Sequence, residues 1–154
     1  MGIVLGVEEI SQIGNNTCWM AACNMIHMYY KGQPLFWEHR YESDLPGNIN
    51  TVAELNNFSW ENIQNSFGDI KDAIDDNRLL LADTTLTVNG AGHAVVISGY
   101  DDTNGNQIYV LDPAIDISIA GSIGSWMAYN NAGPYNSGAS NFVIDGLYYA
   151  QYDF

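Results

Sequence analysis

The stretch QIGNNTCWMAACNMIHMYY, residues 12–30, decides how the fold is built. From Cys18 onward it is apolar on nearly every face, which is typical of a helix that runs through the middle of a domain. The polar residues 15–17 can cap the start of this helix, and residues 32–34 (GQP) are a stop signal. We therefore predict a buried central helix that carries Cys18 in its first turn.

Downstream of residue 78 the sequence changes to a strand pattern. Short runs of β-branched and aromatic residues bounded by turn residues predict strands. These runs cover residues 79–88, 93–100, 107–112 and 142–152. Before them, residues 59–78 have apolar positions at helical spacing, which predicts a second helix with a weak cap at Ser59. Residues 113–141 are rich in Gly, Ala and Ser and predict a long loop with room for one short strand.

Helices first and strands afterwards predict an α+β fold, in which the N-terminal central helix packs on a C-terminal antiparallel β-sheet. The 154 residues, of which 47% are hydrophobic, suit one domain with an ordinary core. We expect this single domain to span residues 1–154, with a mainly helical part over 1–78 and a mainly β part over 79–154.

The charge balance excludes several classes of partner. Only 4 Lys and Arg residues stand against 18 Asp and Glu residues, which gives a formal net charge of −14. Such a surface repels polyanions at long range, so we expect no nucleic acid and no anionic membrane as a partner. No apolar run approaches the ~18 residues that a membrane-spanning helix requires.

The cysteines and histidines do not predict a metal site. Cys18 and Cys23 lie on different faces of one helix, which disfavours a disulfide between them. The three histidines, His27, His39 and His93, do not fall at zinc-ligand spacings around them. We therefore expect no metal and no other cofactor.

Cys18 has the position of a nucleophile. The N-terminus of a helix favours the thiolate form of a cysteine through the positive end of the helix dipole. Cys23 lies deeper among apolar residues and is interpreted as a small core residue. The side-chain amide of Gln12, six residues before Cys18, could join the Cys18 backbone N–H in stabilising an acyl oxyanion.

Among the histidines, His93 is the candidate base. It follows a glycine-rich turn at the start of a buried strand, where its side chain can face a cleft. His27 lies too far along the first helix to reach back to the thiol, and the charged surroundings of His39 are typical of a surface residue.

Two aspartates compete to orient His93. If residues 104–105 form a two-residue hairpin turn, Asp116 lies opposite His93. Asp112 then lies on the same face of the sheet but ~13 Å along it, at ~3.3 Å per residue. A shifted register, a bulge or a bend after the strand would bring Asp112 closer. Local geometry leaves both aspartates open.

Three motifs together resemble the papain-like cysteine peptidases, in particular a short bacterial branch that includes bacteriocin-leader-processing peptidase domains and staphopain-type enzymes. The motifs are Q-x5-C-W-x-A at 12–21, GHAVVISGYD at 92–101 and YVLDP at 109–113, in the order in which the family has them. The chain departs from larger papain enzymes because NNTCW replaces their Cys-Gly-Ser-Cys run and no disulfide partners are present.

The resemblance implies a papain-like fold and peptide-bond hydrolysis. It assigns Gln12 to the oxyanion hole, Cys18 to the nucleophile, His93 to the general base and acid, and Asp112, by its D-P pair, to the orienting group. Asp116 remains the rival from local geometry. A peptide or protein is then the expected substrate, and a separate inhibitor or propeptide is a further candidate partner.

Two other functions stay open at this stage. The same residues could perform acyl transfer or deamidation, as toxins and effectors do, or the chain could be a non-catalytic binding or immunity module. Few lysines with many Asn, Tyr and Gly residues favour export or secretion by a bacterium, although the N-terminus lacks the features of a signal peptide and a cytoplasmic location stays open.

Overall fold

A computed structural model of the chain describes residues 2–12, 18–34, 53–54 and 56–152. The predicted helix cap at 15–17 and the predicted surface position of His39 lie outside these residues. The helices are α1 (Cys18–Lys31), α3 (Phe67–Asp75) and α4 (Ile117–Ala120). The strands are β1 (Ile3–Val4), β2 (Phe58–Ile63), β3 (Leu80–Leu86), β4 (Gly92–Asp101), β5 (Gln107–Leu111), β6 (Gly124–Ala128), β7 (Tyr135–Asn136) and β8 (Asn141–Tyr152).

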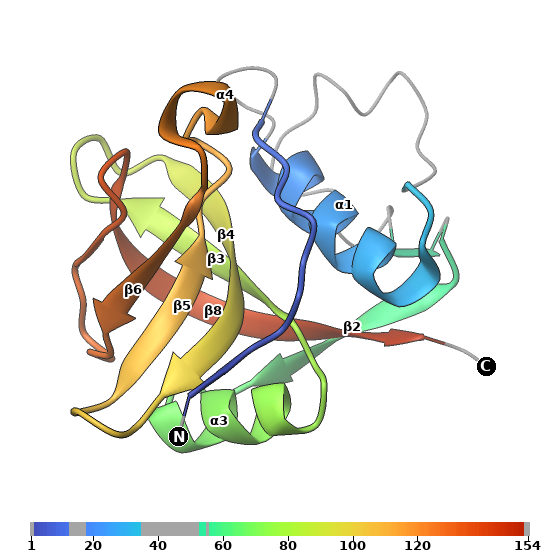
Figure 1. Cartoon of the computed structure of the whole chain (residues 1–154), viewed down its shortest axis with the longest axis horizontal. Coiled ribbons are helices and arrows are strands. Elements are labelled where there is room, and N and C mark those ends of the chain that lie inside the picture. The colour runs from blue at the N-terminus through green and yellow to red at the C-terminus, as the bar shows by residue number, and fades with distance from the viewer. Residues whose placement is uncertain (1, 13–17, 35–52, 55, 153–154) are drawn as a thin grey trace.

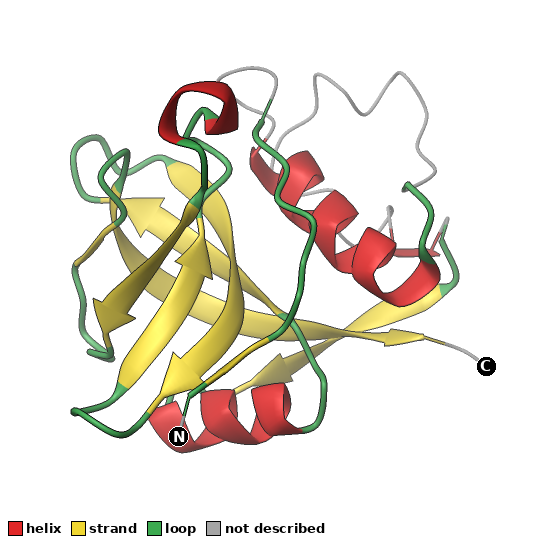
Figure 2. Cartoon of the chain, viewed as in Figure 1, coloured by secondary structure: helices red, strands yellow, loops and turns green. Residues whose placement is uncertain are grey.

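One antiparallel sheet organises the molecule. Its strands follow the order β2-β8-β3-β4-β5-β6, while β1 pairs with β4 and β7 pairs with β8. Figure 1 shows α1 beside one face of this sheet and α3 at the bottom of the view, below the strands. The red helices in Figure 2 flank the yellow strands. The predicted α+β class and the antiparallel sheet are therefore confirmed, and the predicted N-terminal helix is α1.

Two apolar clusters hold these layers together. The first contains the buried face of α1, with Trp19, Met25 and Ile26, packed against Leu81 and Val96 of the sheet. The second joins α3 to the opposite faces of the same strands. Adjacent residues of a strand point to opposite faces of the sheet. Because helices cover both faces here, the first half of β3 (Leu80–Ala82) and the middle of β4 (Ala94–Ile97) are continuously apolar.

The predicted helix over residues 59–78 is only half right. Residues 58–63 form the strand β2, which pairs with β8 from Phe58↔Tyr152 to Ile63↔Leu147. The helix α3 begins later, where the side chain of Ser66, and not that of Ser59, caps it by accepting a hydrogen bond from the Asp69 N–H. The apolar positions in FSWENI fit the spacing of a helix as well as that of a strand. The segment forms a strand because it pairs with the long strand β8.

The segment over residues 113–141 is also more regular than the predicted loop. It holds α4 and the strands β6 and β7. Gly124 at the start of β6 lies opposite Leu111, against the ring of Tyr109, where a Cβ would meet the Tyr109 hydroxyl. The composition rich in small residues therefore reflects close packing against β5 as well as turns.

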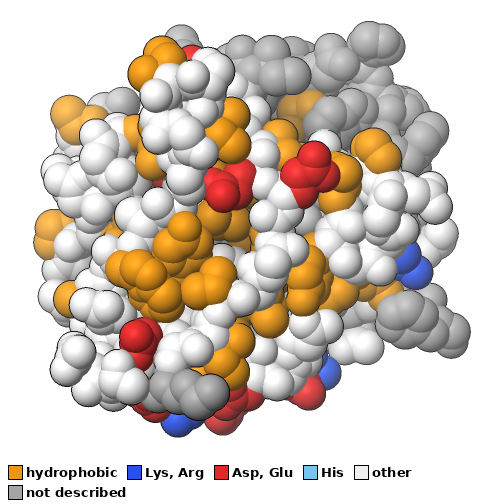
Figure 3. Space-filling view, viewed as in Figure 1, with side chains coloured by type: hydrophobic (Ala, Val, Ile, Leu, Met, Phe, Trp, Pro, Cys, Tyr) orange, Lys and Arg blue, Asp and Glu red, His pale blue; other side chains and the backbone are white. Residues whose placement is uncertain are grey.

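The surface carries the acidic excess. On the face drawn in Figure 3, acidic side chains are spread across the surface, and the basic ones lie near its edge. Two of the described cations are paired with acids, Lys71 with Asp102 at 2.9 Å and Arg78 with Asp76 at 3.2 Å. In the described part of the chain, no helix is long and apolar enough to cross a membrane.

Candidate active site

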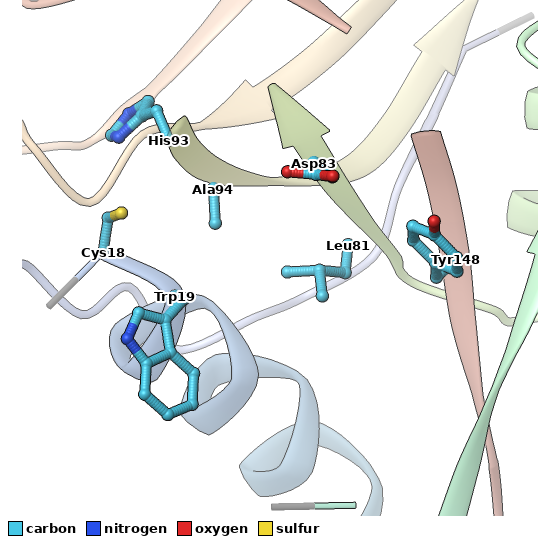
Figure 4. A pocket seen from close by; sticks show the side chains of 7 residues that line it. All are labelled: Cys18, Trp19, Leu81, Asp83, His93, Ala94 and Tyr148. Atoms are coloured by element: carbon cyan, nitrogen blue, oxygen red, sulfur yellow. The ribbon is translucent and has the colours of Figure 1, made fainter. Parts of the chain in front are cut away.

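Cys18 is the first residue of α1, where the helix meets the start of β4. Its side chain is buried, with 5% of the residue exposed, and lies within hydrogen-bonding reach of the His93 imidazole. Figure 4 shows the thiol and the imidazole next to each other at one end of a cavity. The structure therefore brings the predicted nucleophile and the predicted base together from opposite halves of the chain.

The imidazole of His93 is held by Asp112. Nε2 of His93 donates to Oδ1 of Asp112 across 2.7 Å, and both side chains are buried. Because Nε2 is engaged by the carboxylate, Nδ1 is the ring nitrogen left to face the Cys18 thiol. This arrangement fixes the ring orientation with the thiol on one side and the carboxylate on the other.

Asp112 is itself held by three donors. Besides His93, the Ala114 N–H donates to Oδ1 across 2.9 Å and the Ser137 hydroxyl donates to Oδ2 across 2.6 Å. Asp112 is completely buried, so these donors replace water around a charge that would otherwise be costly to bury. The carboxylate is therefore held in place from both of its oxygens.

A β-bulge sets the position of Asp112. The pairing of β4 with β5 shifts between Ile97 and Gly99, and the hairpin closes through residues 102–106 instead of the predicted two-residue turn. Beyond the last pair, Val96↔Leu111, the same register puts Asp112 opposite Val95. Asp112 is thus a diagonal neighbour of His93, within reach of its side chain.

Gly99, at the bulge, lies against β1. Residue 99 pairs with Val4 of β1, and a Cβ there would meet the Ile3 carbonyl oxygen at 2.5 Å. Any larger residue would push β1 away from β4. A glycine at this position therefore allows β1 to pair with β4.

Asp116 lies elsewhere. Its side chain caps α4, where Oδ1 accepts hydrogen bonds from the N–H of Ser118 at 3.0 Å and from the Ser118 hydroxyl at 2.6 Å. The carboxyl is exposed to solvent. Of the two aspartates that the sequence left open, the structure places Asp112 on the imidazole.

Gln12 lies next to the loop that carries Asp112. Its backbone N–H donates to the carbonyl of Pro113 across 2.8 Å. The preceding residue, Ser11, donates to the Ile115 carbonyl at 2.7 Å and accepts from the Ile117 N–H at 2.9 Å. These bonds tie the half-buried Gln12 to the same end of the sheet as His93 and Asp112.

The electrostatics of the site favour a protonated imidazole. Burial lowers the pKa of His93, but hydrogen bonds to Asp112 and Cys18 outweigh it and raise the pKa to about 9. For Asp112, burial acts to raise the pKa, while the hydrogen bond from His93 and those from Ser137 and Ala114 bring it below its usual range. An imidazolium held by an ionised carboxylate is therefore the charge state of the His93–Asp112 pair that this environment stabilises.

The family model described as Peptidase_C39 like family matches residues 4–134, which is most of the chain and includes Gln12, Cys18, His93 and Asp112. The chain belongs to this family of papain-like cysteine peptidases. No curated protein matched the chain in a separate search. Membership supports a peptidase whose substrate is a peptide or protein.

The remaining candidates have other surroundings in this peptidase. Cys23 is completely buried, and burial raises the pKa of its thiol far above the usual range. Nδ1 of His27 lies 2.8 Å from the Tyr152 hydroxyl, and burial lowers the pKa of His27. Among the described residues, no group of three or more His, Cys, Asp and Glu side chains could hold a metal ion.

Sequence reasoning missed the supporting residues of the site. The turn over 137–140 supplies Ser137 to Asp112 and puts the Ser140 hydroxyl 3.5 Å from His93 Nε2. Ser137 also accepts from the Ser140 N–H across 3.0 Å, which orders this turn. A serine in a Gly- and Ser-rich segment gives no signal by itself, because only the fold brings it to a carboxylate 25 residues away.

Proposed function

We propose that this peptidase hydrolyses peptide bonds with Cys18 as nucleophile, His93 as general acid and base, and Asp112 as the group that orients the imidazole. The hydrogen bond between His93 and the buried Asp112, together with the interaction of the same imidazole with Cys18, carries the proposal. Each member has the chemical property that its role requires. We extend the proposal to papain-like packing, with α1 and the sheet meeting at the site.

In the first step, the Cys18 sulfur attacks the carbonyl carbon of the scissile bond. A C–S bond forms, and the carbonyl electron pair moves onto oxygen. We propose that the side-chain amide of Gln12 and the backbone N–H of Cys18 donate to this oxyanion. The position of Gln12 beside Pro113 and the helix start at Cys18 support this assignment.

In the second step, the oxyanion collapses and the C–N bond breaks. The Nδ1 proton of His93 moves to the leaving amine, and the acyl group stays on Cys18 as a thioester. Water then gives a proton to His93 and attacks the thioester, and the thiolate leaves as the carboxylic acid product is released. Asp112 remains ionised throughout and stabilises the imidazolium whenever it is present.

Product analysis tests this function directly. A peptide library is incubated with the protein and with its Cys18→Ala and Cys23→Ala variants, and the products are identified by mass spectrometry. We expect hydrolytic fragments from the wild type and from Cys23→Ala, and none from Cys18→Ala. A one-dalton gain or an adduct without chain cleavage would instead indicate a deamidase or an acyltransferase. Fragments from Cys18→Ala would contradict the proposed nucleophile.

A further inference from the structure

The cavity beside Cys18 is lined by one carboxylate. Its described lining residues are Cys18, Trp19, Leu81, Asp83, His93, Ala94 and Tyr148. In Figure 4 the thiol and the imidazole lie at one end, while Asp83 and Tyr148 lie at the other, with Leu81 between them and α1. A side chain that enters from the scissile bond would therefore pass apolar surface before it reaches a negative charge.

The sheet register explains why these side chains share one wall. Asp83 of β3 lies opposite Ala94 of β4 and opposite Gly146 of β8, and Leu81 lies opposite Tyr148. Paired residues and residues two apart along a strand point to the same face. This face is the one against which α1 packs, and it leads from α1 to the outer strands.

Gly146 leaves room for the aromatic part of this wall. A Cβ at Gly146 would lie 3.0 Å from both Cε2 and the hydroxyl oxygen of Tyr148. The Tyr148 ring therefore lies over the glycine that pairs with Asp83, next to the carboxylate. An aromatic face beside a carboxylate suits an ammonium or guanidinium group.

No described lysine or arginine pairs with Asp83. Lys71 pairs with Asp102, Arg78 pairs with Asp76, and Lys31 lies over the ring of Tyr152, 5.0 Å from its centre. Burial raises the pKa of Asp83, and so does the like charge of Asp145, another acid among the described residues.

A bulge brings Asp145 to this position. The pairing of β3 with β8 shifts between Asp83 and Thr84, so that Asp145 becomes the extra residue on β8. Oδ2 of Asp145 accepts a hydrogen bond from Thr85, which lies on the Asp83 face. The negative potential of the cavity is therefore reinforced from the neighbouring strand.

We propose that this cavity is a substrate subsite that binds a Lys or Arg side chain next to the scissile bond. The aliphatic stem would lie along Leu81 and Tyr148, and the cationic head would pair with Asp83 at the exposed end of the cavity. Asp83 is then the specificity-determining residue. This inference rests on the proposed function, because it needs Cys18 to be the nucleophile.

Peptidyl probes with a thiol-reactive group at the scissile position test the inference. Matched probes carry Lys, norleucine or Glu at one of the two residues on the acyl side, and rates of Cys18 labelling are compared. At one of these positions, we expect labelling of the wild type to be about tenfold faster with Lys than with norleucine, and slowest with Glu. Asp83→Asn should bring the Lys to norleucine ratio close to one, and Asp83→Lys should favour Glu.

Two controls separate this inference from the proposed function. Asp116→Asn removes an exposed carboxyl that does not line the cavity and should leave the ratio unchanged. Iodoacetamide reports the reactivity of Cys18 without a peptide. If iodoacetamide labels Cys18 in a His93-dependent way but the Lys to norleucine ratio is close to one in the wild type, the subsite is wrong and the nucleophile stands. The subsite is also wrong if Asp83→Asn slows both probes equally. If no peptidyl probe labels Cys18, both proposals fail.

Discussion

Two places along α1 each combine a cysteine with a histidine, but in different surroundings. At the start of the helix, Cys18 contacts His93, which is held by Asp112. A turn and more further on, Cys23 lies in the core near His27, which contacts a tyrosine hydroxyl. The pKa is raised to about 9 for His93 and lowered for His27. Two features therefore distinguish the proposed reactive pair, Cys18 and His93, from the structural pair, Cys23 and His27. Cys18 lies at the N-terminus of the helix, and His93 is hydrogen-bonded to the buried carboxylate of Asp112.

Removing the two thiols should produce the largest contrast. Cys18→Ala removes the nucleophile, and we expect kcat/KM for peptide hydrolysis to fall by at least about a thousandfold. Cys23→Ala creates a small space in the core and should cost about 1 kcal/mol of unfolding free energy, with activity within a few-fold of wild type. Kinetics and thermal unfolding of both variants would check this. Equal activity losses in the two variants would contradict the assignment of Cys18 as the nucleophile and Cys23 as a core residue.

The two histidines should differ almost as strongly. His93→Gln removes the group that shuttles the proton, and we expect a loss of about a thousandfold in kcat with Cys18 still present. His27→Gln keeps a polar group that can contact Tyr152 and should retain most of the activity. Steady-state kinetics with one peptide would measure both, and a His27 variant as inactive as the His93 variant would show that the core is required for catalysis.

The carboxylate should set both the rate and the pH range of activity. Asp112→Asn keeps the shape of the side chain but removes its charge, and we expect a loss of about a hundredfold in kcat/KM. The alkaline limb of the pH profile, expected near pH 9 in the wild type, should move down towards the ordinary histidine value of 6.5. A matched Asp116→Asn variant should leave the rate and the profile unchanged. An alkaline limb that stays in place in Asp112→Asn would mean that another group sets it.

The same titration should appear in stability. Because the pKa of His93 is higher in the folded protein than its ordinary value of 6.5, the protonated ring stabilises the fold. This contribution is complete below pH 6.5 and is lost as the pH rises through about 9. Unfolding free energies measured between these pH values should therefore fall more in the wild type than in His93→Gln. Parallel curves for the two proteins would contradict a raised pKa.

The smallest effect should come from the hydroxyl that supports Asp112. Ser137→Ala removes one of the donors to this buried carboxylate, and we expect kcat to fall about three- to tenfold and the alkaline limb to shift down slightly. Ser118→Ala is a close control, because Ser118 makes an equivalent hydroxyl contact to the exposed Asp116. If the two serine variants behave alike in kcat and in the pH profile, Ser137 does not position Asp112.

The sequence predicted the elements that depend on local pattern. The apolar run after Cys18 and the four β-rich segments became α1, β3, β4, β5 and β8, since their patterns match the structures that bury them. It did not predict β2, because the spacing of its apolar residues also fits a helix. The pairing of β2 with β8, which makes it a strand, is not visible in the local sequence.

The choice between Asp112 and Asp116 could not come from local geometry. It depends on the bulge between Ile97 and Gly99, which a regular two-residue hairpin turn does not include. The D-P pair at residues 112–113 pointed to Asp112 through the family resemblance. The roles of Ser137 and Asp83 could not be predicted from the sequence, because only the folded chain brings these two residues to the site.

The covalent labelling site tests the central claim most directly. The protein is treated with the epoxide inhibitor E-64 near neutral pH, digested, and analysed by mass spectrometry to locate the adduct. We predict one adduct on Cys18, absent in Cys18→Ala, strongly slowed in His93→Gln and unaffected in Cys23→Ala. An adduct on Cys23, or equal labelling of Cys18 with and without His93, would contradict the Cys18–His93 pair as the reactive centre.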